Sequence, residues 1–132
     1  MKYMLDTHTW IWWHMNPQKL SQKVKRIVGN EERYDEILLS AISPWEFSKL
    51  IEKKRIGISC DPMDWISRAL DMPKLRLVPL SPVLAYRSTV LPQPFHDDPA
   101  DQMIVATARE ENATLLTKDK RILTYKDVRS LW

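Results

Sequence analysis

Short apolar runs alternate along the chain with segments whose apolar residues recur at helical spacing. The apolar runs predict strands at residues 3–5, 37–39, 75–80 and 114–117, and a short last strand within 128–132. The segments between them predict helices over 9–15, 21–28, 43–54, 61–70, 81–91 and 98–111, several of which open on Ser or Asp followed by Pro. Strands that alternate with helices indicate a parallel sheet covered on both faces.

No repeat, low-complexity tract or Gly/Ser-rich linker interrupts this alternation, so we expect residues 1–132 to form a single domain. The expected architecture is a three-layer α/β/α sandwich around a mainly parallel sheet of four to five strands with right-handed crossovers. In such sheets the functional crevice lies beyond the C-terminal ends of the strands. Residues that follow the predicted strands are therefore the first candidates for a site.

Composition excludes several classes of protein. The chain has 132 residues, 44% of them apolar and 28% charged, which suffices for a core without disulfides. Cys60 is the only cysteine, which excludes a disulfide framework or multi-cysteine zinc site and favours a reducing compartment, so we expect a cytoplasmic location. Asp6 interrupts the first apolar run too early for a signal peptide, and no stretch reaches a membrane span. Gly29 and Gly57 are too far apart for a phosphate-binding loop.

Four acidic residues stand near the ends of predicted strands. Asp6 follows the first strand, and Glu46 lies one turn into the helix after the second. Asp119 follows the fourth strand, and Asp101 lies in the first turn of the helix before it. In a parallel sheet these carboxylates converge at one edge, where they repel one another unless a cation neutralises them. An all-oxygen site suits Mg²⁺ or Mn²⁺, which activate water for phosphoryl transfer.

Helix capping is the alternative explanation for these acids. A polar residue three positions before an acid, the spacing of a capping box, occurs at Ser43–Glu46, Asp98–Asp101 and Asp61–Asp64. For the last pair we expect only a cap. Asp119 has equal grounds to cap the turn over 120–123. Asp6 has no comparable capping signature, which favours a functional role for it.

Four segments carry a wider pattern: Leu5-Asp6-Thr7-His8, Ser43-x-Trp45-Glu46, His96-x-Asp98-Pro99-x-Asp101 and Leu115-Leu116-Thr117-x-Asp119. Their order, spacing and apolar frames resemble the PIN-domain ribonucleases, specifically VapC-like toxins of type II toxin–antitoxin pairs, over nearly the whole chain. The resemblance implies an endoribonuclease that depends on Mg²⁺ or Mn²⁺. It implies that the catalytic, metal-binding acids are Asp6, Glu46, Asp101 and Asp119.

The resemblance also implies roles for neighbouring residues. Asp98 is expected to be an accessory metal-binding acid or a cap. Thr7 and Thr117 match hydroxyl positions that support the metal-binding acids in relatives, with ordinary turn hydrogen bonding as the alternative. The family often has Arg where this chain has Gln102, so any contact made by that Arg is missing. Asp97 adds an acid beside the site without an assigned role.

The three histidines lack the spacing of zinc ligands. His8 and His96 flank acidic motifs, and His14 follows the tryptophan-rich segment. We expect His8 and His96 to be solvated or associated with helix caps, with substrate contact as the alternative.

Three tryptophans lie within one helical turn. Trp10 and Trp13 share a helical face, which is typical of core packing, whereas Trp12 projects elsewhere. Three such rings exceed what a small core needs, so an exposed remainder of Trp10, Trp12 and Trp13 predicts a groove for a protein partner. The resemblance implies that this partner is a cognate antitoxin, and we expect a homodimer.

Basic residues cluster at 23–26, 49–55 and 118–121, and the net charge is +3. Most such clusters are solvated surfaces, but Lys or Arg around an acidic centre suits a nuclease because these side chains hold the phosphates that flank the scissile one. Lys118, Lys120 and Arg121 are best placed to contact RNA, since they adjoin Asp119.

Three other classes were compared with a nuclease. A receiver-type phosphoacceptor module requires paired acids after the first strand, and a haloacid-dehalogenase-like phosphatase requires a second Asp two residues after the first. Asp6-Thr7-His8 fits neither. The remaining alternative is a non-catalytic interaction protein of the same fold whose acids serve as caps.

Overall fold

Five short parallel strands form the centre of the protein in the computed structural model, which describes residues 1–132. They are β1 (Lys2–Leu5), β2 (Glu36–Ser40), β3 (Leu75–Val78), β4 (Thr114–Leu116) and β5 (Ser130–Leu131). The strand order is β3-β2-β1-β4-β5, and every neighbouring pair is parallel. The predicted parallel sheet is confirmed, and its last strand is the shortest.

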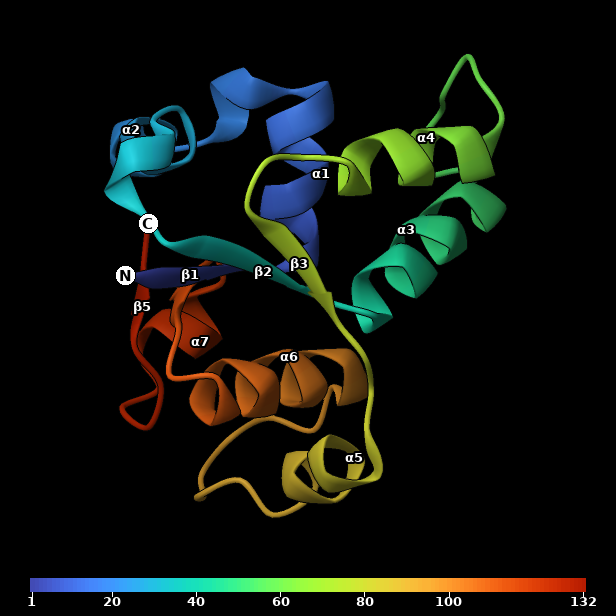
Figure 1. Ribbon diagram of the computed structural model, residues 1–132. Coiled ribbons are helices and arrows are strands. Elements are labelled where there is room, and N and C mark those ends of the chain that lie inside the picture. Colours follow the sequence, from blue (N-terminus) through green and yellow to red (C-terminus); the bar gives the residue numbers. More distant parts are fainter.

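Helices cover both faces of this sheet (Figure 1). One face carries α1 (Thr7–Met15), α2 (Gln22–Val28), α3 (Ile42–Glu52) and α4 (Pro62–Leu70). The other carries α5 (Pro82–Ser88), α6 (Pro99–Glu110) and α7 (Lys120–Leu123). Two 3₁₀ turns, η1 (Pro17–Lys19) and η2 (Glu31–Arg33), complete the elements. The three-layer α/β/α sandwich is thus confirmed. None of the helices combines the length and apolar character that crossing a bilayer requires.

Successive residues of the three central strands, β1, β2 and β4, point into two separate cores. Tyr3 and Leu5 join the core beneath α1 to α4, whereas Met4 joins the core beneath α5 to α7 together with Leu38 and Leu115. Strands buried on both faces read as continuous apolar runs, because neither set of side chains meets water. This double burial is why the central strands were recognisable in the sequence, whereas β3 is exposed at Arg76 and Leu77.

Trp10 belongs to the first core. Its side chain is fully buried, its ring lies edge-on to Trp65 at 5.2 Å, and its indole Nε1 donates to the carbonyl of Ala69 at 3.2 Å. The prediction that Trp10 contributes to an exposed groove is therefore wrong. Trp12 and Trp13 remain half-buried.

Two helix starts differ from the prediction. α1 begins at Thr7, and Asp6 is its N-cap, with Oδ1 accepting from Thr9 N at 2.9 Å. Asp6 therefore caps a helix although its sequence carries no capping signature, and its functional role stays a prediction. α3 begins at Ile42 without a side-chain cap, so the predicted capping box of Ser43 and Glu46 is also wrong. Glu46 consequently lies inside the helix and has no capping role there.

The other predicted caps are confirmed. In each case a carboxylate oxygen accepts a backbone N–H at the start of a helix: Asp61 from Asp64 at 3.2 Å, Asp98 from Asp101 at 3.0 Å, and Asp119 from Arg121 at 2.8 Å. Asp98 and Asp119 thereby start α6 and α7, both of which point their N-terminal ends toward the C-terminal edge of the sheet.

Candidate functional site

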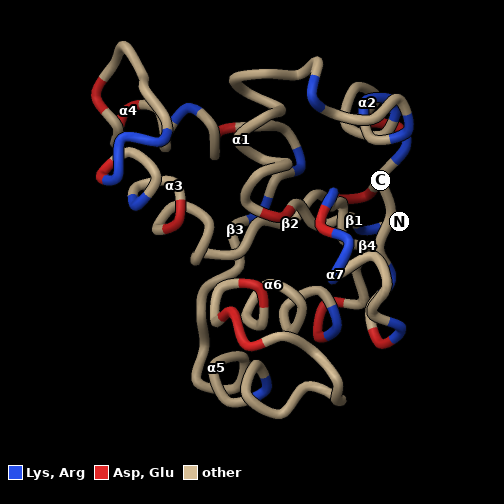
Figure 2. The backbone as a smooth tube through the Cα atoms, turned by 180° about the vertical axis from the view of Figure 1, so that it is seen from behind, with Lys and Arg blue, Asp and Glu red and all other residues tan.

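An open cavity of about 480 Å³ lies at the C-terminal edge of the sheet. All four predicted acids line it, although they come from four different parts of the chain. Figure 2 shows acidic positions in α3 and at the start of α6. The lining residues are Asp6, Thr7, His8, Trp12, Glu46, Asp98, Asp101, Ile104, Lys118, Asp119 and Arg121.

The Asp6 carboxylate is buried and held on both oxygens. Oδ1 accepts from Thr9 N at 2.9 Å and lies 2.7 Å from Thr9 Oγ1. Oδ2 accepts from the hydroxyl of Thr117, whose Oγ1 in turn accepts from Asp119 N at 3.0 Å. Because a carboxylate oxygen has two acceptor positions, Oδ2 retains one for a ligand. Thr117 thus couples the first and fourth strand ends.

Glu46 faces the same cavity from the second turn of α3. Its Oε1 accepts from the hydroxyl of Thr7, which also lies 2.9 Å from Ser43 Oγ. Its Oε2 receives no hydrogen bond from the protein. Burial raises the pKa of Glu46, and the negative charges of Asp101 and Asp98 add to this rise against the opposing Thr7 bond. Holding Glu46 in its charged form therefore lowers the stability of the folded protein.

Asp101, the third acid that lines the cavity, contacts a histidine. His96 Nε2 lies 2.7 Å from Asp101 Oδ2, and both side chains are largely shielded from solvent. Burial raises the pKa of Asp101, the contact with His96 lowers it, and the charge of Asp98 raises it again, so that the net direction is upward. Ligand atoms of His96, Asp101 and Asp119 lie within 4.8 Å of one another.

Arg121 places a positive charge among these acids. Its Nη2 donates to Asp119 Oδ2 at 3.0 Å and lies 3.5 Å from Asp101 Oδ2. Burial alone would raise the pKa of Asp119, but the bonds from Arg121 outweigh burial and lower it. Arg121 therefore offsets the burial of Asp119, whereas burial still leaves the pKa of Glu46 and of Asp101 raised.

His96 is the residue that sequence reasoning missed. The expectation that it is solvated is wrong, because its side chain is 17% exposed and contacts Asp101 in the first turn of α6. Its Nδ1 is buried without a hydrogen-bond partner. Gln102, which stands where the family often has Arg, donates from Nε2 to the His96 carbonyl at 3.1 Å. The only sequence signal was the position of His96 two residues before Asp98.

The predicted basic and accessory residues divide into two groups. Lys118 and Arg121 line the cavity, and Lys118 Nζ lies 5.9 Å from the centroid of the Trp12 ring. Lys120 does not line it. Asp98 lines the cavity while capping α6, whereas Asp97 is exposed outside it.

The donor set of this cavity fits a divalent cation. Carboxylate oxygens are the ligands that Mg²⁺ and Mn²⁺ prefer, and two of the carboxylates have a raised pKa that a nearby cation would reverse. Asp6 and Glu46 line the cavity but lie outside the tight group formed by His96, Asp101 and Asp119. A ligand set of four carboxylates stays a prediction.

Comparison with protein families gives one match over almost the entire chain. The family model described as PIN domain matches residues 3–128. Ribonuclease VapC22 from Mycobacterium tuberculosis is 34% identical over 126 residues, which cover 96% of this chain and 93% of that protein.

Solved structures give the same fold at lower identity. VapBC2 from Rickettsia felis, bound to a DNA fragment from its promoter, matches with a TM-score of 0.68 and 19% identity, covering 100% of this chain and 99% of that chain. FitAcB from Neisseria gonorrhoeae matches with a TM-score of 0.67 and 20% identity, covering 100% and 97%. At these identities the likeness concerns the fold.

Proposed function

Because the chain belongs to the PIN domain family, we propose that it is an endoribonuclease that depends on Mg²⁺ or Mn²⁺ and acts as the toxin of a toxin–antitoxin pair. One observation carries the proposal: four carboxylates from separate elements line a single cavity at the strand ends. Its 34% identical relative is a ribonuclease, which supports the activity. The likeness to a solved toxin–antitoxin complex from Klebsiella pneumoniae supports the toxin role.

Each residue of the acidic cavity has a distinct role in the proposed reaction. Asp6, Glu46, Asp101 and Asp119 would hold the cation, which when bound supplies an activated water and neutralises charge on the scissile phosphate. Thr117 orients Asp6, Thr7 orients Glu46, and His96 orients Asp101. Lys118 and Arg121 stand at the cavity to contact neighbouring phosphates.

A non-catalytic interaction protein is the second candidate, because Asp6, Asp98 and Asp119 all cap helices. Capping accounts for those three acids but leaves Glu46 unexplained. Glu46 caps nothing and is held in an environment that disfavours its charge. A structural role gives no reason to retain such a residue, which favours the nuclease.

Cleavage of a panel of structured RNAs tests the proposal. With Mn²⁺ we expect internal cleavage that stops when a chelator is added and returns when Mn²⁺ is restored in excess. Isothermal titration of the metal-free protein with Mn²⁺ should show binding. A folded protein that neither binds Mn²⁺ nor cleaves any RNA of the panel is the interaction protein instead.

We further propose that a cognate antitoxin docks across the exposed parts of Trp12 and Trp13, and that the toxin itself forms a homodimer. Trp12 borders the acidic cavity, so a partner on this surface can place a cation near the acids. Affinity purification from the native host should recover a small partner, and Trp12→Ala should weaken its retention. Retention unaffected by Trp12→Ala contradicts this placement of the antitoxin.

A further inference from the structure

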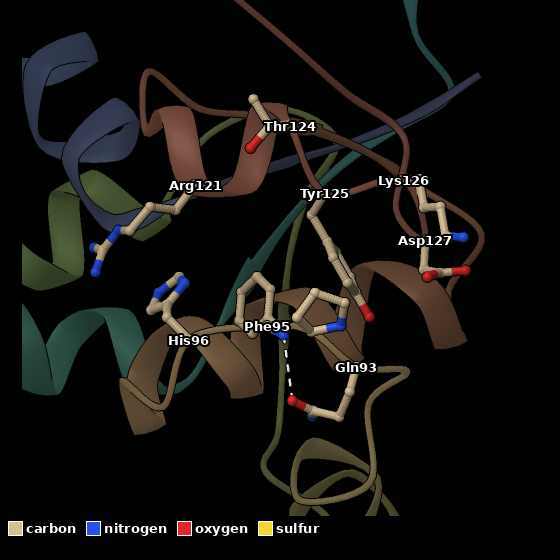
Figure 3. Close-up of a pocket in the computed structure, with 9 residues that line it drawn as sticks. Gln93, Phe95, His96, Arg121, Thr124, Tyr125, Lys126 and Asp127 are labelled. Atoms are coloured by element: carbon tan, nitrogen blue, oxygen red, sulfur yellow. Dashed lines mark hydrogen bonds between the residues drawn. The ribbon is translucent and has the colours of Figure 1, made fainter.

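Two further cavities share lining residues with the acidic one. The first, of about 170 Å³, shares Thr7, His8 and Glu46 with the acidic cavity and continues along α3. The second, of about 620 Å³, is shown in Figure 3 and shares Arg121 with the acidic cavity. The two neighbouring cavities have no lining residue in common, so each borders a different part of the acidic cavity.

The surface along α3 combines an exposed aromatic ring with unpaired cations. Trp45 is 56% exposed, and Lys49 Nζ lies 5.8 Å from the centroid of its ring. Lys49 is paired with Glu52 at 3.0 Å, but no acid lies within ion-pair distance of Lys53 or Arg55. We call Trp45, Lys49, Lys53 and Arg55 the α3 surface. It offers stacking area and positive charge next to Glu46.

The cavity on the other side has an aromatic floor. The Phe95 and Tyr125 rings lie 4.7 Å apart between centroids, and Figure 3 shows both rings between His96 and Lys126. Lys126 is exposed and has no ion-pair partner. This cavity, named here the Phe95 cavity, reaches the acids through His96, which contacts Asp101.

We propose that unpaired RNA crosses the acidic cavity between these two surfaces. Trp45 stacks on a base on one side of the scissile phosphate, and the Phe95 cavity receives a base on the other side. The proposal rests on the proposed ribonuclease activity and adds how the substrate is held. Aromatic rings beside cations are the recognition chemistry of single-stranded nucleic acid, because splayed bases stack while the backbone phosphates contact Lys and Arg.

The charge pattern favours RNA over an antitoxin as the occupant. Lys53 and Arg55 line one neighbouring cavity without an ion-pair partner, and Lys126 lines the other beside Asp127. Positive charge next to the acids suits a polyanion whose phosphates contact Lys and Arg. An A-form duplex keeps its bases stacked inside, so Trp45 has nothing to stack on there. Single-stranded RNA should therefore bind more tightly than the same sequence annealed to its complement.

Fluorescence anisotropy with a labelled single-stranded RNA about 12 nucleotides long tests the α3 surface. Trp45→Ala should weaken binding about 10-fold, the cost of losing one stacked base. The double variant Lys53→Gln, Arg55→Gln should weaken binding and reduce the slope of log affinity against log salt by about 1.4, because two phosphate contacts are lost. The matched control Lys23→Gln, Lys25→Gln on α2 removes the same charge elsewhere and should bind like the parent.

Truncated substrates test the arrangement on both sides. Once a cleavage site is mapped, the RNA is shortened from either end. Removing nucleotides from one end of the RNA should weaken binding to the parent but not to Trp45→Ala. Removing them from the opposite end should weaken binding to the parent but not to Phe95→Leu combined with Lys126→Gln. Thermal melting of each variant establishes that it is folded.

The results distinguish failure of the ribonuclease proposal from failure of the RNA path proposed here. If the parent neither binds nor cleaves RNA, the ribonuclease proposal itself fails. If the parent cleaves RNA but the variants bind and cleave like the parent, or if both sets of variants respond to the same end, the path proposed here is wrong. If Trp45→Ala weakens antitoxin retention and leaves RNA binding unchanged, the α3 surface is a protein interface and the proposal is overturned.

Discussion

Glu46→Gln is expected to lower the rate of RNA cleavage by at least about 100-fold in a protein that stays folded. Gln has nearly the same volume, and its Oε1 can still accept the hydrogen bond from Thr7. The substitution therefore removes one negative charge and one anionic oxygen, and little else. Cleavage rates at saturating Mn²⁺, with circular dichroism to establish folding, measure the effect. Three further variants should lower the cleavage rate to a similar extent: Asp6→Asn, Asp101→Asn and Asp119→Asn.

Substituting a residue that supports a metal ligand should lower activity less than substituting the ligand itself. Thr117→Val removes the hydroxyl that donates to Asp6, and losing such a partner of a metal ligand typically costs roughly 10- to 100-fold in activity or metal affinity. Thr114→Val is the matched control, because Thr114 is also buried on β4 but donates no side-chain hydrogen bond and lies at the opposite end of the strand.

The acids should behave as one unit. If they hold a common cation, Asp6→Asn combined with Glu46→Gln should be about as inactive as either single variant, because one substitution already disables the site. Asp97→Asn, which alters an exposed acid outside the cavity, should cleave at the parent rate. Full activity in a folded Glu46→Gln protein would remove Glu46 from the site.

Most of the fold was predictable because its signals are local or periodic. The central strands β1, β2 and β4 are buried on both faces and so appear as continuous apolar runs, and the caps at Asp61 and Asp98 are formed with residues three positions away. The strand-end rule then located the acids without any knowledge of side-chain contacts.

The predictions that were wrong concern side chains whose position depends on contacts beyond their own helix. Ser43 has the spacing of a cap, but its hydroxyl instead contacts Thr7, which lies 36 positions earlier. Trp10 is fully buried because α4 supplies Trp65 and Ala69 against it. His96 contacts Asp101 across the turn that starts α6, and no periodic pattern marks such a contact.

In the absence of metal, Glu46→Gln should be more stable than the parent protein. Burial and neighbouring acids raise the pKa of Glu46 in the folded state, so its charged form is disfavoured there relative to the unfolded chain. Gln carries no charge and escapes this cost. We expect a higher Tm in chelator at about pH 7.5, from a gain on the order of 1 kcal/mol. Activity and thermal stability should therefore change in opposite directions.

The sign of the pH dependence follows from the raised pKa. Below the pKa that Glu46 has in the unfolded chain, the carboxyl is protonated in both states and the full stability of the neutral group is present. As the pH rises through the folded-state pKa, that stability is lost, because the unfolded chain releases the proton more readily. The Tm difference between Glu46→Gln and the parent should therefore be small near pH 4 and grow toward about pH 7.5. Asp101→Asn should follow the same direction with a smaller gain, since the amide gives up the charge that faces His96 and Arg121.

Excess Mg²⁺ should reverse this order of stability. A cation that binds only the folded protein raises its Tm by mass action, and the parent should gain more than Glu46→Gln because it keeps all four carboxylates. Asp61→Asn is the internal control: Asn caps a helix about as well as Asp, and Asp61 caps α4 outside the acidic cavity, so this variant should melt like the parent in chelator at either pH. If Glu46→Gln melts below the parent in chelator at about pH 7.5 and gains as much from Mg²⁺, then the Glu46 charge stabilises the folded chain and does not hold the cation. Glu46 would in that case be a structural residue of α3, held by Thr7, and the site would have to be built from Asp6, Asp101 and Asp119 alone.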